Sequence, residues 1–140
     1  SPRDIYDRPA DRFVANFIGD TNFLSAELKS TANGSGIVRL GSGRELRASL
    51  PKAAPPLGPV SIVVRPEHAT ISRDIAAAAL SGRLEHAVYF GTDTHYHLRL
   101  AGGEAFMIRQ QNTRGAGLPY AAGEELGIVI GDDAAQVVRD

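Results

Sequence analysis

The stretch VRLGSGREL at residues 38–46 recurs as LRLAGGEAF at residues 98–106, at an offset of 60 positions (98 − 38). Each copy has two short runs of alternating residues around a glycine-rich tip. This pattern is typical of a β-hairpin, because glycine readily adopts the positive φ angles of tight turns. At the same offset, Leu24 corresponds to Leu84 and Leu28 to Val88. The sequence therefore predicts two structural repeats.

Short strand patterns, separated by turns rich in glycine and proline, fill most of the chain after residue 21. They lie at residues 22–29, 36–40, 44–49, 60–65, 69–72, 82–90, 94–100, 104–111, 126–130 and 136–139. Five short strands per repeat is the number in an OB-type barrel, whose closure removes the exposed edges of the sheet. We therefore predict an all-β fold, a tandem OB-like β-barrel built from two five-stranded repeats, with one short N-terminal helix.

That helix is predicted over residues 9–18. Pro9 is tolerated at a first helical position, and Phe13 and Phe17 are spaced to share one face. Gly19 follows as a natural helix stop.

The predicted organisation has four parts. Residues 1–21 form a linker with the helix, and residues 22–72 form the first OB-like repeat. Residues 73–81 are a connection, either a surface segment or a single helical turn, and residues 82–140 form the second repeat. The proline-rich segment 50–59 is predicted to be a rigid loop, because proline lacks the N–H that a strand ladder needs.

Composition excludes several classes of protein. The net charge is −1 and the pI about 6.4, so the chain as a whole is not attracted to nucleic acid or anionic lipid. The absence of cysteine removes disulfides and cysteine-based zinc sites, and suits a reducing compartment. No stretch approaches the roughly 18 apolar residues of a membrane span.

No pattern of catalytic residues is present. A P-loop needs Gly-Lys-Ser/Thr, and neither Lys29 nor Lys52 has that context. The segment 128–133 superficially resembles the apolar strand and acid that hold Mg²⁺ in such enzymes, but it is better interpreted as a strand entering a turn. We predict no catalytic residue and no residue that binds a cofactor.

Two histidines are candidate metal ligands. His95 and His97 share one face of a predicted strand, as two zinc ligands can, but a zinc site needs a third ligand and usually a fourth. His86 or His68 would have to fold nearby, and nothing in their spacing requires it. Two solvent-facing histidines on an amphipathic strand are the ordinary case, so no metal site is predicted.

Several motifs together resemble one family. Residues 5–24 resemble the exit segment of an ABC-importer ATPase, where the nucleotide-binding domain joins its C-terminal domain. Val64-Arg65-Pro66-Glu67-His68 resembles the signature of the transport-associated OB (TOBE) domain, and residues 89–96 and 109–112 are similar to its second half. Within the family, these segments resemble the spermidine/putrescine-type ATPases more than the maltose or molybdate types.

The resemblance implies a function. The chain would be a regulatory and dimerisation domain of an importer's ATP-binding subunit. It would carry out no catalysis itself, and ATP and Mg²⁺ would be bound by a missing ATPase domain. Its partners would be a second copy, that ATPase domain and, through it, the importer's membrane subunits, with a small-molecule effector also possible and no nucleic acid. It would work in the cytoplasm, peripheral to the inner membrane. The motif positions expected to be structural or interfacial are Arg65, Pro66, Glu67, Tyr89, Gly91, Gln111 and Asn112.

Two other functions stay open. A stand-alone binder of a small ligand or oxyanion would hold it with backbone and hydroxyl groups at the glycine-rich tips 34–36 and 41–43. An OB-type binder of nucleic acid is disfavoured by the charge balance and by an aromatic content of only 6%, because single strands are bound by aromatic stacking in a basic groove.

Overall fold

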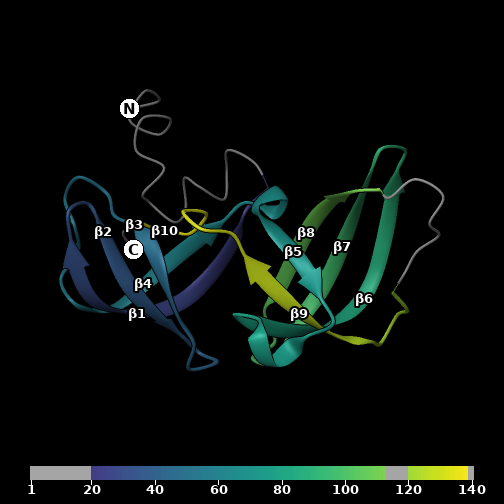
Figure 1. Ribbon diagram of the computed structural model, residues 1–140, viewed down its shortest axis with the longest axis horizontal. Coiled ribbons are helices and arrows are strands. Elements are labelled where there is room, and N and C mark those ends of the chain that lie inside the picture. The colour runs from purple at the N-terminus through teal and green to yellow at the C-terminus, as the bar shows by residue number, and fades with distance from the viewer. Residues whose placement is uncertain (1–19, 113–119, 139–140) are drawn as a thin grey trace. The chain divides into compact units, whose positions relative to one another are not determined.

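The computed structural model describes residues 20–112 and 120–138, in which the regular structure is strand apart from two single 3-10 turns (Figure 1). All ten predicted strands are present, so the all-β prediction is confirmed. The helix predicted over residues 9–18 lies outside the described residues. The strands are β1 (Asn22–Ala32), β2 (Ser35–Leu40), β3 (Glu45–Ser49), β4 (Gly58–Val64), β5 (Ala69–Ser72), β6 (Leu80–Phe90), β7 (Asp93–Leu100), β8 (Ala105–Gln111), β9 (Glu125–Ile130) and β10 (Gln136–Val138).

The strands form two compact units. Pro66–Gly131 make up unit 2, and the described residues on either side make up unit 1. Unit 1 is a closed barrel with the strand order β1-β2-β3-β10-β4. Its strand β4 is buried continuously from Val60 to Val64, as expected for a strand covered on both faces. The centre of its core is Leu24, Leu28, Val38, Leu40, Ile62, Val64 and Val137.

Unit 2 is a five-stranded sheet with the order β5-β9-β6-β7-β8. Along β7, the alternate residues Thr94, Tyr96 and Leu98 are buried, whereas His95, His97 and Arg99 point to the other face. The segment 73–81, predicted to be a connection or a helical turn, contains the 3-10 turn Ile75–Ala77, which is capped by the Asp74 carboxylate.

The repeated hairpins of the sequence have the same local geometry. In unit 1, the Gly43 N–H donates to the Leu40 carbonyl at 2.9 Å, and Gly43 has a φ of 88°. In unit 2, the Gly103 N–H donates to the Leu100 carbonyl at 2.9 Å, with a φ of 96° at Gly103. Glycine is needed at this third loop position, because the left-handed conformation strains any other residue. The glycine pattern that predicted the repeat therefore corresponds to a shared turn.

The fifth strand of each unit differs from the expected division into residues 22–72 and 82–140. Strand β5 pairs with β9 of unit 2, and β10 pairs with β3 and β4 of unit 1. The predicted division assumed that consecutive strands share a sheet, which is the usual preference. Short strands with similar alternation carry no signal of which sheet they enter. Each five-stranded unit thus contains one strand from the segment assigned to the other repeat.

The alignment of the repeats is also shifted in β6. Leu28 is opposite Val38 and is followed by a bulge, and it is Leu84, not Val88, that takes the same place opposite Leu98. Leu28 and Leu84 are buried, whereas Val88 is 38% exposed. The expected match of Leu28 with Val88 is therefore wrong. The cause is the greater length of the β6–β7 hairpin beyond its bulge, which an alignment without a gap cannot accommodate.

Candidate functional site

The segment Arg65-Pro66-Glu67-His68 runs from the last residue of the first part of unit 1 into unit 2. Strand β4 ends at Val64, Arg65 is exposed, and Pro66 is almost completely buried at the start of the 3-10 turn Pro66–His68. Proline suits this place, since its fixed φ favours a first helical position and its missing N–H is not needed there. Pro66 therefore anchors the chain where it enters unit 2.

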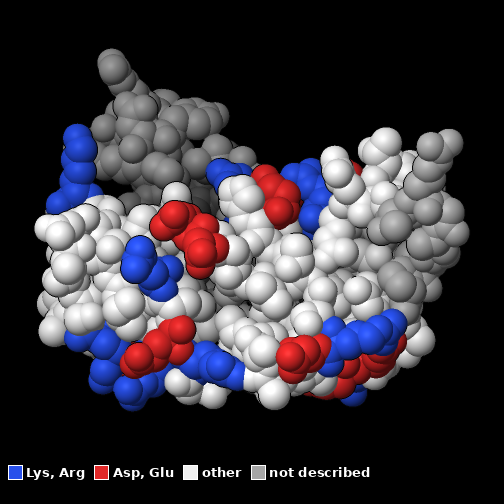
Figure 2. Space-filling model, viewed as in Figure 1, with Lys and Arg blue, Asp and Glu red and all other residues white. Residues whose placement is uncertain are grey.

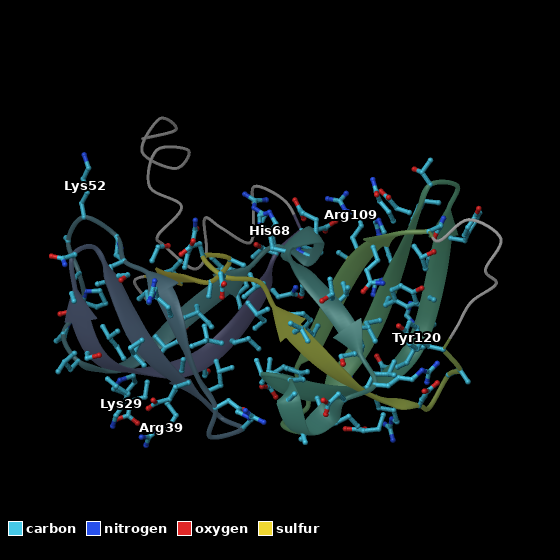
Figure 3. The ribbon with its side chains drawn as sticks, viewed as in Figure 1. Lys29, Arg39, Lys52, His68, Arg109 and Tyr120 are labelled. Carbon is cyan, nitrogen blue, oxygen red and sulfur yellow. The ribbon has the colours of Figure 1, made fainter. Side chains whose placement is uncertain are left out.

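Glu67 is held by an ion pair with β8. The Arg109 guanidinium lies 3.3 Å from its carboxylate, and both side chains are close to 40% exposed. Burial alone would raise the pKa of Glu67, but the hydrogen bond from its own backbone and the pairing with Arg109 outweigh it and hold the pKa below its usual value. Arg109 and His68 lie at the same end of unit 2 (Figure 3). The ion pair between Glu67 and Arg109 thus joins the motif segments 64–68 and 109–112, which are far apart in the sequence.

Asn112 fixes the turn between β6 and β7. Its Nδ2 donates to the Gly91 carbonyl at 2.6 Å, and its backbone N–H donates to the Thr92 carbonyl at 2.8 Å. Its Oδ1 accepts a hydrogen bond from the hydroxyl of Thr94, which is buried. Gly91 has a φ of 73°, as a tight turn between two strands requires. Gly91 and Asn112 therefore form one structural unit, with Gln111 directly opposite Asp93 beside it.

Gln110 belongs to the motif 109–112 but is not among the predicted site residues. Its Oε1 accepts the Ile71 backbone N–H at 2.8 Å. Strands β5 and β8 are the two ends of the sheet order, so this side chain joins the edges of an otherwise open sheet. In unit 1 the equivalent seam is made by the backbone, where the Ser49 N–H donates to the Ala135 carbonyl at 2.9 Å. The sequence signal was a polar residue at an alternation position facing inward.

The tip of the β6–β7 hairpin carries the most prominent exposed apolar surface that the described residues show. Val88 is 38%, Tyr89 67% and Phe90 57% exposed, and they are consecutive. The Phe90 ring lies 4.4 Å from the His95 ring, measured between centroids. Because successive strand residues point to opposite faces, Val88 and Phe90 expose apolar surface on one face of the β6–β7 arm and Tyr89 on the other. Exposed apolar side chains of this kind are a suitable contact surface for a protein. Of the predicted residues, Tyr89 lies on this surface, which we call the hairpin tip.

The histidines are more closely grouped than the sequence required. His86 is directly opposite His97, and their rings stack at 4.4 Å between centroids with an angle of 12°. His95 is two residues from His97 on the same face, whereas His68 belongs to the 3-10 turn. In residues 20–112 and 120–138, no three His, Cys, Asp or Glu side chains converge as the ligands of a metal ion.

A second cluster lies at the other end of unit 2, at Tyr120 (Figure 3). The Tyr96 and Tyr120 rings meet edge to face at 5.7 Å, and the Arg73 guanidinium lies 4.8 Å from the centre of the Tyr120 ring. Burial and the neighbouring Tyr120 raise the pKa of Tyr96. Arg73 also pairs with Glu124, whose pKa is lowered by the Ala121 N–H and by Arg73. The cluster joins β7 to the segment that follows β5 and to the segment that precedes β9.

Among the described residues, the two lysines and the glycine tip 41–43 form no phosphate or anion site. Lys29 lies on β1 and pairs with Glu27 at 3.5 Å, and Lys52 lies between β3 and β4. At the glycine tip 41–43, the Gly43 N–H and the Ser42 hydroxyl are engaged in the turn itself. Acidic and basic side chains are interspersed on the visible face of each unit (Figure 2). The visible face therefore shows no large patch of basic side chains, as binding of a polyanion would need.

One apolar hollow accompanies the proline-rich loop of unit 1. Its volume is about 270 Å³, and it opens widely to solvent. Its lining offers no charged side chain to a cationic or anionic effector, since it consists of Ala53, Ala54, Pro55, Pro56, Pro59, Val60 and Val138.

No helix among the described residues is long and apolar enough to cross a membrane.

The family model of the TOBE domain matches residues 62–138, which include all of unit 2 and strand β10. The chain belongs to the TOBE domain family. The match begins within β4 and ends at β10. The residues that match the TOBE family therefore include all of unit 2 and, from unit 1, the end of β4 and all of β10. The resemblance carried by Arg65, Pro66 and Glu67 is thereby confirmed at the level of the family.

Relatives of this TOBE chain match it along most or all of its length. It is 53% identical over 140 residues to the spermidine/putrescine import ATP-binding protein PotA of Mesorhizobium japonicum, covering 100% of the chain and 38% of that protein. It is 49% identical to PotA of Ruegeria pomeroyi, covering 100% of the chain and 37% of that protein. The Fe(3+) ions import ATP-binding protein FbpC of Brucella abortus is 32% identical over 108 residues, covering 77% of the chain and 30% of that protein.

The fold is also similar to that of a solved structure. The cytoplasmic molybdate-binding protein ModG superposes with a TM-score of 0.67, covering 85% of this chain and 96% of that protein. The sequence identity is 18%, so the likeness concerns the fold alone. The chain thus has an all-β fold similar to that of this OB-like protein, and it spans less than two fifths of the PotA proteins that it matches.

Proposed function

We propose that this TOBE chain is the C-terminal accessory domain of the ATP-binding subunit of an ABC importer, and that the importer carries polyamines such as spermidine and putrescine. The observation that carries this proposal is the match of the entire chain to two PotA proteins at 53% and 49% identity. The match to the iron-import protein is lower and shorter, at 32% over 108 residues. Polyamines are therefore favoured over iron as the transported solute.

The domain acts in this proposal without catalysis. ATP and Mg²⁺ are bound by the ATPase domain of the full-length subunit, because the two lysines of this chain lie in a strand and a proline-rich loop instead of a phosphate-binding turn. The subunit works in the cytoplasm, where it reaches the importer's membrane subunits through its ATPase domain.

The role of the domain is to hold two ATP-binding subunits together. The hairpin tip supports this role, since Val88, Tyr89 and Phe90 expose apolar side chains at the end of β6, beside a turn fixed by Asn112. A small-molecule effector fits less well among the described residues, because the hollow of unit 1 has an apolar lining. The oxyanion-binding alternative is not favoured, since the polar groups of tip 41–43 bond within the turn.

Uptake measurements test the proposed solute. The gene that encodes the full-length subunit is deleted, and uptake of radiolabelled spermidine, putrescine and Fe³⁺ is followed in the same cells. We expect loss of polyamine uptake, restored by the gene on a plasmid, with iron uptake unchanged. Loss of iron uptake with normal polyamine uptake would contradict the proposal.

A further inference from the structure

We propose that His86 and His97 form a chelating site for a late first-row divalent transition metal on the outer face of unit 2. The pair consists of directly opposed residues of the antiparallel strands β6 and β7. Their rings are already stacked at 4.4 Å between centroids. This inference goes beyond the proposed transport function and does not depend on it.

The backbone supplies the geometry of a chelate. Directly opposed residues of an antiparallel pair have Cβ atoms about 4.5–5.5 Å apart. From that separation, two imidazoles bind one ion once each ring rotates about its χ2 angle, a torsion with broad preferences. In the stacked arrangement the rings are close to parallel, at an angle of 12°. Water fills the remaining coordination positions.

The surroundings permit an ion to enter. His86 is exposed and His97 is half-buried, so the pair is open to solvent on one side. The nearby cation Arg99 is paired with Glu85 at 3.1 Å, which lowers its repulsion of a metal ion. Met107, opposite His97 on β8, adds a polarizable side chain on the same face.

His95 is not assigned to the site. Its ring packs on Phe90 at 4.4 Å between centroids, and its strand position is opposite Val88. His68 lies on the 3-10 turn, away from β6 and β7 in sequence and pairing. With no cysteine in the chain, these four histidines are its strongest ligands for soft and borderline metals. The chain therefore contains its own control residues.

Metal bound here would connect β6 to β7 just beyond the bulge that follows Leu84. The hairpin arm past this point carries Val88, Tyr89 and Phe90. A bond between the two strands at the base of the arm restricts its opening, because an ion bound only by the folded state stabilises that state. The site would thus stiffen the hairpin tip.

Titration calorimetry of the 140-residue chain with NiCl₂ tests the site, with MgCl₂ as a control for hard cations, which prefer oxygen ligands. We expect one Ni²⁺ per chain and no heat from Mg²⁺. His86→Asn and His97→Asn each weaken Ni²⁺ binding by more than about tenfold, because each removes a direct ligand. His68→Asn and His95→Asn bind Ni²⁺ as the unmodified chain does. Circular dichroism checks that every variant is folded.

A second measurement identifies the ligands directly. On addition of Ni²⁺, we expect paramagnetic broadening of the imidazole resonances of His86 and His97, and slower amide exchange in the arm between them. The proposal is overturned if the unmodified chain binds no Ni²⁺. It is equally overturned if folded His86→Asn and His97→Asn retain the affinity, or if His68→Asn or His95→Asn loses as much.

Discussion

At the scale of single residues, polar side chains of the motif segments make hydrogen bonds and ion pairs within the fold. Glu67 and Arg109 join the 3-10 turn to β8, and Asn112 fixes the turn at Gly91. The sequence identified most of these positions through a family resemblance, without their partners. Gln110 was missed because the alternation shows only that its side chain faces inward, and does not show its hydrogen-bond partner on a distant strand.

Replacing Gln110 by Leu tests the side-chain seam of unit 2. The substitution keeps the volume but removes the acceptor of the Ile71 N–H, which we expect to lower the free energy of unfolding by about 1 kcal/mol. Urea denaturation measures the change. Gln111→Leu is the matched control, because Gln111 is exposed and its side chain lies on the other face. Equal stability of the Gln110 variant and the unmodified chain would show that the seam contributes nothing.

The stability contributed by Glu67 is expected to depend on pH. Its pKa in the folded chain is below the unfolded value, so the contribution is present above the unfolded pKa and is lost as the pH falls through the folded one. Glu67→Gln should therefore be less stable than the unmodified chain at pH 7, with the difference disappearing in strong acid. Thermal unfolding across this range is the measurement.

The same comparison in an Arg109→Gln background serves as the control for Glu67. Without the guanidinium, the effect of Glu67→Gln at neutral pH should become smaller, as a coupled pair requires. An unchanged effect would show that Arg109 is not the partner that lowers the pKa.

At the scale of elements, hairpins were predictable and their register was only partly so. Alternation located every strand, and the glycines located the turns at Gly43 and Gly103. The match of Leu28 with Val88 failed because the β6–β7 arm is longer than its counterpart. That extra length raises Tyr89 and Phe90 into solvent, so the feature that defeated the alignment is also the feature that makes the candidate contact surface.

The turn of this hairpin can be tested with one methyl group. A Cβ added at Gly91 or at Gly41 meets no atom within 4 Å, but only Gly91 has a positive φ, of 73°. Gly91→Ala should destabilise the chain by about 1–2 kcal/mol, because a side chain strains the left-handed conformation. Gly41→Ala is the control and should be close to neutral. Similar midpoints in urea for the two variants would contradict the assigned turn.

At the scale of the whole molecule, the number of strands was predictable and their distribution was not. Unit 2 begins at Pro66. However, nothing in the sequence of β5 (Ala69–Ser72) indicates that this strand pairs with β9 instead of joining the barrel of unit 1. Likewise, Gln136–Val138 joins β3 and β4. These pairings connect residues far apart in the chain, and local pattern carries no information about them.

The proposed role in holding subunits together depends on the hairpin tip. Tyr89→Ser combined with Phe90→Ser removes most of the exposed apolar surface of the tip without touching the turn at Gly91. We expect this double variant to weaken self-association of the chain. Leu57→Ser is the matched control, since Leu57 is 60% exposed in unit 1.

Sedimentation velocity over a concentration series tests the central claim most directly, with the chain itself and with its Tyr89→Ser/Phe90→Ser variant. The account predicts that the unmodified chain passes from monomer to dimer as its concentration rises, and that the variant shifts this transition to higher concentration while Leu57→Ser does not. An unmodified chain that stays strictly monomeric at every concentration would contradict the claim that this domain holds two ATP-binding subunits together.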